Sequence, residues 1–236
     1  MSRSHLHAQH FLRSPRLVAE LIGHSNIRKN DTVYDLGAGS GVITTALARR
    51  CKQVIAVEIE PSALKSLRQN ISSLDNVTVI EKDILQLDPP DQPYKIFSNI
   101  PFSHSAAIVR KFTQLNSPPK SIYLIVQKQF ARKLVPGDDH FTSQLSAEIS
   151  PWFTIRIRKP LRKTDFTPPP AVDTVLIEIK RREGPLVPTV DAANYRQFIA
   201  RCFTDQKYFR DLKKPFSPEL RPSQLTLEQW VRLYSQ

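Results

Sequence analysis

The sequence predicts an α/β fold, in which strands and helices alternate around a mostly parallel sheet and a small helical lobe follows at the C-terminal end. Three observations support this prediction. Apolar strand-like runs alternate with helical patterns through about residue 135. A glycine-rich turn over residues 37–41 connects one such strand to one such helix, and residues 189–236 carry only helical patterns.

The expected elements follow one another in a regular order. A short helix over residues 17–22 leads into the first strand. Strands are expected at residues 32–36, 53–57, 77–81, 94–98 and 122–126. Helices are expected at residues 42–50, from Pro61 onward, after the turn at residues 99–102, and at residues 130–134.

The pattern changes after this alternating region. Residues 152–158 and 172–180 are strand-like runs of alternating character, joined by a loop that contains Pro168-Pro-Pro170. Such alternation is typical of strands with one solvated face. We therefore expect these two strands to pair antiparallel at one edge of the sheet.

The C-terminal part is expected to form a separate lobe. Residues 184–188 have the composition of a linker, and helices are expected at residues 194–207 and 226–234. This organisation predicts two domains, residues 1–183 and a small helical lobe over residues 184–236.

The most informative feature is the tetrapeptide Asn99-Ile-Pro-Phe102, at the exit of the strand expected at residues 94–98. The side-chain oxygen of Asn99 and the carbonyl of Ile100 can each accept an N–H bond, and Pro101 fixes the backbone that carries this carbonyl. Phe102 offers a flat face on which a base can stack. The combination suits the amino group of a flipped base. The alternative is a strand-ending turn with a core phenylalanine.

The glycine turn is a second motif. Gly37-Ala-Gly-Ser-Gly41 holds three of the six glycines in the chain, and a turn of this kind lets the backbone approach a ligand closely. Glu58 ends the next strand about 20 residues later, where a carboxylate suits the two hydroxyls of a ribose. The alternative is a glycine turn of structural use only.

The spacing of the glycines discriminates between nucleotide-like ligands. It departs from the Gly-x-Gly-x-x-Gly dinucleotide fingerprint, and Asp35 before the turn disfavours a nearby pyrophosphate. A ligand with a ribose, an amino-acid tail and no phosphate fits better, and S-adenosylmethionine is such a ligand. After the strand at residues 77–81, Asp83 can accept from an adenine amino group and the Ile84 N–H can donate to the ring. Alternatively, Asp83 caps the following turn.

In these motifs the chain resembles the rRNA adenine N6-methyltransferases, and among them the Erm type. The resemblance covers roughly residues 5–180, and each motif alone would be a weak signal. The similar segments are Gln9-His-Phe-Leu12, Asp35-Leu-Gly-Ala-Gly-Ser-Gly41, Val57-Glu-Ile-Glu60, Lys82-Asp-Ile-Leu85, Lys95-Ile-Phe-Ser-Asn-Ile-Pro-Phe102, Ile122-Tyr-Leu-Ile-Val126, Phe130-Ala-Arg-Lys-Leu134 and Phe166-Thr-Pro-Pro-Pro-Ala-Val172.

The resemblance implies both a fold and an activity. The fold would be the Rossmann-like class I S-adenosylmethionine-dependent methyltransferase fold, with a seven-stranded, mostly parallel sheet. Residues 1–183 would form the catalytic domain that binds S-adenosylmethionine, and the helical lobe of residues 184–236 would bind RNA. The activity would be methylation of N6 of one adenine in the peptidyl-transferase loop, in domain V of 23S rRNA. In this family that modification confers resistance to macrolides, lincosamides and streptogramin B.

The resemblance also implies roles for particular residues. Those expected at the methyl-transfer site are Asn99, Ile100, Pro101, Phe102 and Phe166, and for Phe166 a core position is an equal alternative. Those expected to contact the cofactor are His10, Leu12, Gly37, Gly39, Glu58, Ile59, Asp83, Ile84 and Asn99. Two of these positions depart from the family, since His10 stands where Asn is usual and Phe102 where Tyr is common.

Charge indicates the kind of partner. The formal net charge is +12 and the pI is about 9.9, a balance that is typical of proteins with a polyanionic partner. We expect RNA contacts from residues in the basic clusters, namely Arg110, Lys111, Lys128, Arg132, Lys133, Arg162 and Lys163. The partner would be 23S rRNA or an assembling large ribosomal subunit. The alternative is a solvated basic surface without function.

Composition argues against several other classes of protein. There is no apolar run of 18 residues and no apolar signal segment at the N-terminus, so neither membrane contact nor secretion is expected. The use of only two cysteines is typical of a reducing, cytoplasmic setting. We also expect a monomer. The two cysteines, Cys51 and Cys202, lack metal-ligand spacing. His5, His7 and His10 lie close together, but no cysteine or carboxylate accompanies them, so no metal site is expected.

Two other functions remain open. The first is the 16S rRNA dimethyladenosine transferase of ribosome assembly, which usually carries Asn-Leu-Pro-Tyr where this chain has Ile100 and Phe102. The second is a non-catalytic nucleic-acid-binding relative, such as a mitochondrial transcription factor. The intact residues Gly37, Glu58, Asp83 and Asn99 argue against that second alternative.

Overall fold

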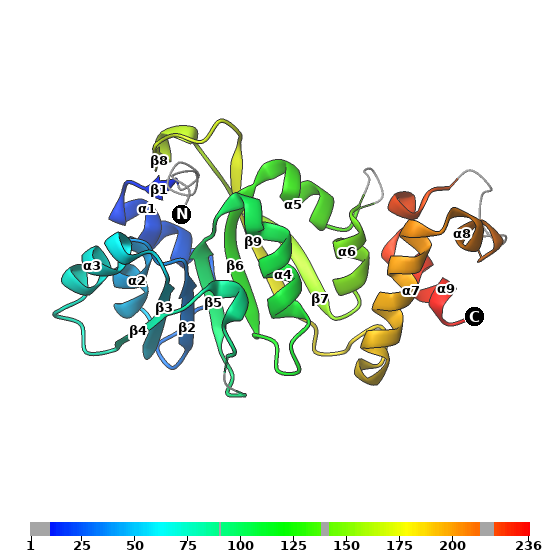
Figure 1. The fold of residues 1–236 in the computed structure, drawn as a ribbon, viewed down its shortest axis with the longest axis horizontal. Coiled ribbons are helices and arrows are strands. Elements are labelled where there is room, and N and C mark those ends of the chain that lie inside the picture. Colours follow the sequence, from blue (N-terminus) through cyan, green and yellow to red (C-terminus); the bar gives the residue numbers. More distant parts are fainter. Residues whose placement is uncertain (1–9, 90, 138–141, 213–219) are drawn as a thin grey trace. The chain divides into compact units, whose positions relative to one another are not determined.

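The computed structural model describes residues 10–89, 91–137, 142–212 and 220–236, and it divides into two compact units (Figure 1). Unit 1 comprises Met1–Lys128 and Ile157–Glu178, and unit 2 comprises Gln129–Arg156 and Ile179–Gln236. The division at residue 183 into two domains stays a prediction. Gln9, His5 and His7 lie outside the described residues.

A seven-stranded sheet is the central element of the fold. Its strands pair in the order β4-β3-β2-β5-β6-β9-β7, and the pairs β2–β3, β2–β5, β3–β4 and β5–β6 are parallel. The strands are β2 (Thr32–Leu36), β3 (Gln53–Glu58), β4 (Val77–Glu81), β5 (Lys95–Asn99), β6 (Ser121–Gln127), β7 (Phe153–Leu161) and β9 (Thr174–Arg181). The prediction of a seven-stranded, mostly parallel sheet is therefore confirmed.

A small second sheet was not anticipated by the sequence analysis. It pairs β1 (Phe11–Leu12) antiparallel with β8 (Phe166–Thr167), with Phe11 opposite Thr167 and Leu12 opposite Phe166. Two-residue strands are too short to show hydrophobic periodicity. This pairing joins the beginning of the described chain to a loop more than 150 residues later.

The expectation that buried and exposed residues alternate along residues 172–180 is wrong. Residues Thr174, Val175, Leu176 and Ile177 are all buried, because β9 lies inside the sheet between β6 and β7 and is covered on both faces. The edge strand is β7, in which exposed residues separate the buried ones.

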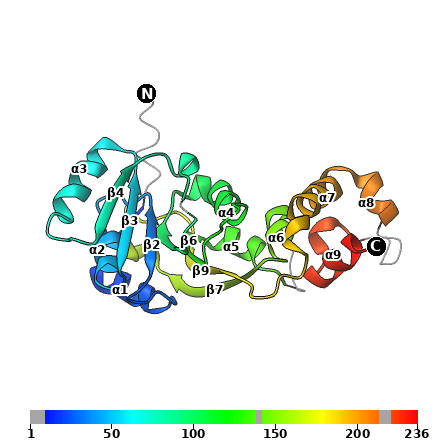
Figure 2. The same ribbon diagram turned by 90° about the horizontal axis from the view of Figure 1, so that it is seen from below.

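Helices cover both faces of the sheet in unit 1, with α1 and α2 on one side and α4 on the other (Figure 2). The helices are α1 (Pro15–Gly23), α2 (Val42–Ala48), α3 (Pro61–Asn70) and α4 (Ser105–Thr113). Their first turns show ordinary capping. The side chain of Ser14 accepts the Leu17 N–H at 3.3 Å, and Glu60 accepts the Ala63 N–H at 2.7 Å, just before Pro61.

Each unit has its own apolar core. In unit 1 Val33, Leu47, Phe97 and Leu176 are completely buried from the sheet and its helices. In unit 2 the aromatic residue Trp230 packs with residues of several helices. The helices that begin or lie in this unit are α5 (Lys128–Leu134), α6 (Gln144–Ile149), α7 (Ala192–Thr204), α8 (Gln206–Leu212) and α9 (Leu227–Tyr234).

Among the described helices, none is both long enough and apolar enough to span a lipid bilayer.

We predict that Gly41→Ala destabilises unit 1. Gly41 has a φ of 90°, and a Cβ at this position would lie 2.7 Å from Leu67 Cδ1. The expected loss is about 1–3 kcal/mol in the free energy of unfolding, measured by urea titration.

Gly23→Ala is the matched control. A Cβ at Gly23 has no neighbour within 4 Å, so this substitution should stabilise the helical terminus by about 0.4–1 kcal/mol. Equal unfolding curves for the two variants would contradict the importance of the left-handed turn.

Candidate active site

The carboxyl ends of β2, β3 and β5 meet at one edge of the sheet. Parallel register places Leu36 opposite Val57, so the turn after β2 and Glu58 at the end of β3 are neighbours. A hollow at this edge is lined by residues 10–12, 35, 37–40, 42–43 and 99–102. It therefore combines the N-terminal strand, the glycine turn and the tetrapeptide, three segments that are far apart in sequence.

The glycine turn is held by the backbone of β3. The N–H groups of Gly37 and Ala38 both donate to the carbonyl of Val57, at 2.8 and 3.0 Å. Gly37, Gly39 and Gly41 have φ values of 68°, 57° and 90°. Residues other than glycine rarely adopt such positive φ values. The turn therefore exposes bare backbone to the hollow, as a closely approaching ligand requires.

Glu58 is fixed at the tip of β3. Its side chain is buried, one carboxylate oxygen accepts the Gly39 N–H at 2.8 Å, and the other accepts the N–H groups of Ile59 and Glu60 at 2.8 and 2.9 Å. A carboxylate has about four acceptor sites, so about one remains for a ligand hydroxyl. Its role toward a ribose stays a prediction.

Asp35 is a site residue that the sequence analysis used only to exclude a pyrophosphate. It lines the hollow and is 1% exposed. Oδ2 accepts the Thr44 hydroxyl at 2.7 Å, whereas Oδ1 is buried without a hydrogen-bond partner among the described residues. Burial raises the pKa of this carboxyl from its ordinary value of 3.8 to about 7. A carboxylate oxygen in this situation fits the ammonium group of an amino-acid tail.

Asn99 ends β5, and its amide is oriented by the N-terminal segment. Nδ2 donates to the backbone carbonyl of His10 at 2.6 Å. With the amide nitrogen engaged in this way, Oδ1 is the atom left to accept an N–H from a ligand. The following residues form a tight turn, in which the His104 N–H donates to the Pro101 carbonyl at 3.0 Å. Asn99, Ile100, Pro101 and Phe102 all line the hollow, as expected for neighbours in one motif.

Phe102 and His10 form an aromatic pair at the hollow. Their ring centroids are 5.6 Å apart with an interplanar angle of 28°. The Nδ1 atom of His10 lies 2.8 Å from the carbonyl oxygen of Pro168. His10 therefore contacts both the tetrapeptide and the loop after β8. Its neighbour Leu12 also lines the hollow while packing into the core.

The expectation that Phe166 presents a face to a base is wrong. Its side chain is 0% exposed and belongs to the core of unit 1. The backbone pairing of Phe166 with Leu12 explains this position, since it turns the ring into the core. The alternative interpretation, a core aromatic beside a proline loop, is the correct one.

Three of the other expected cofactor residues lie at the tips of β3 and β4, outside the lining of the hollow. Asp83 Oδ1 accepts the Leu85 N–H at 2.8 Å, so it caps the next turn as the alternative interpretation expected. Ile59 is 57% exposed. Ile84 is near the glycine turn, because its Cδ1 atom would lie 3.5 Å from a Cβ on Gly37. Cofactor contacts of these three residues stay predictions.

Basic residues gather beside the small β1–β8 sheet. Exposed Arg162 pairs with Asp165 at 3.4 Å, and Lys163 Nζ donates to the Ala171 carbonyl at 2.7 Å. The Arg13 N–H donates to the Asp165 carbonyl at 3.0 Å, which places Arg13 next to this cluster. The sequence analysis missed Arg13, because nothing local in the sequence signals its pairing with residues 150 positions later.

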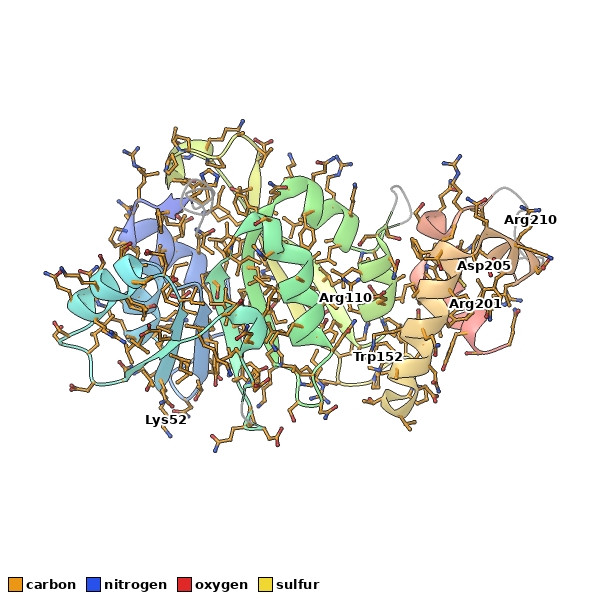
Figure 3. The ribbon with its side chains drawn as sticks, viewed as in Figure 1. Lys52, Arg110, Trp152, Arg201, Asp205 and Arg210 are labelled. Atoms are coloured by element: carbon orange, nitrogen blue, oxygen red, sulfur yellow. The ribbon has the colours of Figure 1, made fainter. Side chains whose placement is uncertain are left out.

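The other basic residues are more widely distributed. Lys128, Arg132 and Lys133 are exposed on α5. Arg110 and Lys111 lie in the last turn of α4, where Figure 3 labels Arg110, whereas the tetrapeptide precedes the first turn of this helix. RNA contacts of these basic residues stay predictions.

In the part of the chain that the structure describes, no group of three or more His, Cys, Asp or Glu residues could hold a metal ion.

Comparisons with known proteins agree on one family. The family model described as ribosomal RNA adenine dimethylase matches residues 3–227. An rRNA adenine N-6-methyltransferase of Escherichia coli is 30% identical over an alignment of 244 residues, which covers 100% of this chain and 96% of that protein. A mitochondrial ribosomal RNA small subunit methyltransferase of Arabidopsis thaliana is 32% identical over 87% of this chain, which spans only 56% of that protein.

Two solved structures share the architecture. The 23S rRNA methyltransferase ErmE has a TM-score of 0.80 and 26% identity, with coverage of 95% of this chain and 98% of its own. A dimethyladenosine transferase from Plasmodium falciparum has a TM-score of 0.76 and 19% identity, with coverage of 95% and 96%. At that lower identity the likeness shows the fold alone.

We predict that Asp35 makes stability depend on pH. Because its folded-state pKa is raised to about 7, the folded protein keeps a proton that the unfolded chain has already released above about pH 4. The contribution of Asp35 to stability is therefore fully present below pH 4 and is lost as the pH rises through 7.

Asp35→Asn removes this titration. The free energy of unfolding of the variant, relative to the wild type, should increase between pH 4.5 and 7.5 in urea titrations. A difference that does not change with pH would show that Asp35 is ionised in the folded protein throughout this range.

Proposed function

Since this chain belongs to the ribosomal RNA adenine dimethylase family, we propose that it methylates N6 of one adenine in the peptidyl-transferase loop of 23S rRNA. The family assigns it an S-adenosylmethionine-dependent adenine N6-methyltransferase activity on rRNA. The choice of 23S rRNA, and resistance to macrolides, lincosamides and streptogramin B, are our proposals. The observation that carries the adenine chemistry is the orientation of Asn99, whose amide oxygen is left free by the bond from Nδ2 to His10.

The likeness to the 23S rRNA methyltransferase ErmE supports 23S rRNA, and the bacterial rRNA adenine N-6-methyltransferases support adenine N6 methylation of rRNA. ErmE covers nearly the whole chain at 26% identity. The relatives from Escherichia coli and Limosilactobacillus reuteri are 30% and 29% identical and extend over 96% and 94% of their own lengths. Ile100, in place of the usual Leu of the 16S enzymes, points in the same direction.

Dimethylation of 16S rRNA is the second candidate. It is favoured by the Arabidopsis small subunit methyltransferase, which is 32% identical, and by a small subunit methyltransferase A of Bacillus licheniformis, which is 29% identical over 84% of this chain. The geometry of the tetrapeptide suits both reactions, because both methylate an adenine amino group.

The residues that line the hollow, together with Glu58 beside Gly39, fit the cofactor. When bound, S-adenosylmethionine supplies a methyl group activated by a sulfonium. The unpartnered Oδ1 of Asp35 would pair with the ammonium of its amino-acid tail, and the carboxylate of Glu58 would accept from a ribose hydroxyl. The bare backbone of Gly37 and Gly39 allows close approach.

The tetrapeptide would orient the base. The lone pair of an adenine amino group is delocalised into the ring, so the nitrogen is a poor nucleophile. Asn99 Oδ1 and the Ile100 carbonyl would accept its two N–H bonds and favour a pyramidal nitrogen, while Phe102 stacks on the ring. Orientation of this kind can contribute several kcal/mol, since effective-molarity effects reach about 7–11 kcal/mol. No general base is required, because the methylated nitrogen becomes acidic and releases its proton to water.

The basic cluster of Arg13, Arg162 and Lys163 would hold the RNA next to the site. These side chains lie beside β1 and β8, whose residues adjoin the hollow. Contacts to phosphates give affinity and register that weaken with salt.

Transfer of labelled methyl groups to separate 23S and 16S rRNA tests the proposed substrate. We expect label on one adenine of the peptidyl-transferase loop in 23S rRNA, mapped by primer extension. Label near the 3′ end of 16S rRNA would overturn the 23S proposal and establish the second candidate.

Asn99→Ala tests the proposed catalytic role. Loss of the oriented acceptor should lower kcat by about 100- to 1000-fold, as for the loss of one preorganised hydrogen bond in other enzymes. The dissociation constant of S-adenosylmethionine, measured by calorimetry, should change little.

The matched control is Asn116→Ala, an exposed residue after α4, which should retain wild-type kcat. Unchanged turnover in Asn99→Ala would remove Asn99 from the mechanism.

A further inference from the structure

His10 contacts Asn99 and Phe102, the two residues proposed to bind the target adenine. We infer that His10 is a positioning residue, which holds Asn99 and Phe102 in the geometry that receives the target base. This inference rests on the proposed function, because Asn99 and Phe102 are proposed to hold that base. From the sequence, His10 was expected among the residues that contact the cofactor.

The backbone of His10 sets the orientation of the Asn99 amide. Its carbonyl oxygen lies 2.6 Å from Asn99 Nδ2 and can only accept a hydrogen bond. An amide rotated by half a turn would place Oδ1 against this carbonyl, which brings two acceptors together. The carbonyl therefore selects the rotamer in which Oδ1 is available to the amino group of adenine.

The imidazole of His10 covers one face of Phe102. The two rings stack with centroids 5.6 Å apart and an interplanar angle of 28°. Because an aromatic ring has two faces, a base that stacks on Phe102 would use the opposite one. His10 then supports the ring from behind and limits its rotation while the base enters.

A third contact holds the imidazole in place. Nδ1 of His10 lies 2.8 Å from the carbonyl oxygen of Pro168, so Nδ1 is the nitrogen that carries the proton in this hydrogen bond. The β1–β8 pairing begins at the next residue, with Phe11 opposite Thr167. One residue of the N-terminal segment thus links the loop after β8 to the turn after β5.

These contacts separate two roles for the same residue. A cofactor role would use the imidazole as a ligand for S-adenosylmethionine, and its loss would weaken cofactor binding. A positioning role uses the imidazole on Phe102 and Pro168, and its loss would disturb the base without altering cofactor affinity. The cofactor role therefore predicts a higher dissociation constant of the cofactor with unchanged kcat. The positioning role predicts a lower kcat with an unchanged dissociation constant.

The experiment compares His10→Ala with His10→Phe on whichever rRNA the wild type methylates. His10→Ala removes the stack and the hydrogen bond, and should lower kcat about tenfold, the size expected for one aromatic pair and one hydrogen bond. His10→Phe keeps a ring on Phe102 and should recover at least about threefold of that loss. The dissociation constant of S-adenosylmethionine, measured by calorimetry, should stay within about twofold in both variants.

A second readout follows the base directly. An rRNA fragment with 2-aminopurine at the target position, mixed with enzyme and S-adenosylhomocysteine, reports unstacking and restacking of that base by its fluorescence. With the wild type, the fluorescence should be that of a flipped base stacked on the protein. His10→Ala should change this fluorescence, and His10→Phe should largely restore the wild-type value. His24→Ala, at the end of α1, is the matched control and should behave as the wild type.

The inference is overturned if His10→Ala weakens cofactor binding tenfold while kcat at saturating cofactor is unchanged, or if neither quantity changes. If His10→Ala does not fold, His10→Phe decides, since the inference requires a kcat about two- to threefold below that of the wild type with unaltered cofactor affinity. Because the comparison uses the rRNA that the wild type methylates, a failure of the 23S proposal and a failure of the His10 role are distinguishable.

Discussion

Parallel pairing of β2 with both β3 and β5 is the constraint on which the site depends. It brings the glycine turn, Glu58 and Asn99 to one edge of the sheet, although these segments are separated along the chain. Hydrogen bonds then lock the edge. The carbonyl of Val57 accepts from the glycine turn, Glu58 accepts from Gly39, and the buried Ser98 hydroxyl accepts the Leu36 N–H at 2.7 Å. Each strand end is thereby fixed by its neighbour, which suits a site where backbone groups must be placed accurately.

The site is completed from outside the main sheet. The β1–β8 pair brings the N-terminal segment over the carboxyl ends of the strands, where His10 meets Asn99 and Phe102. The electrostatics of the hollow complement this arrangement. Among the described residues, Asp35 Oδ1 is buried without a hydrogen-bond partner. This arrangement costs stability in the absence of a cation, and a bound ammonium would relieve that cost. The folded protein without ligand is more stable when this carboxyl is protonated, whereas pairing with an ammonium requires the ionised carboxylate.

Most of the main sheet could be predicted from the sequence, because its strands are continuous apolar runs bounded by glycine, proline or polar residues. The turn that begins at Asn99 could also be predicted, because it follows directly on one of these apolar runs and contains Pro101. What could not be predicted depends on tertiary contacts. The burial of Phe166 follows from a two-residue strand that is too short to show periodicity. The position of Arg13 beside Arg162 depends on the same short pairing, which no local signal announces.

The most direct test of this account is a crystal structure of the protein with S-adenosylhomocysteine and an rRNA hairpin that contains the target adenine. The account predicts a flipped adenine on Phe102, with its amino group within hydrogen-bond distance of Asn99 Oδ1 and the Ile100 carbonyl. Asn99 Nδ2 would remain on the His10 carbonyl. An adenine bound away from Phe102, or an Asn99 amide that turns its nitrogen toward the base, would contradict it.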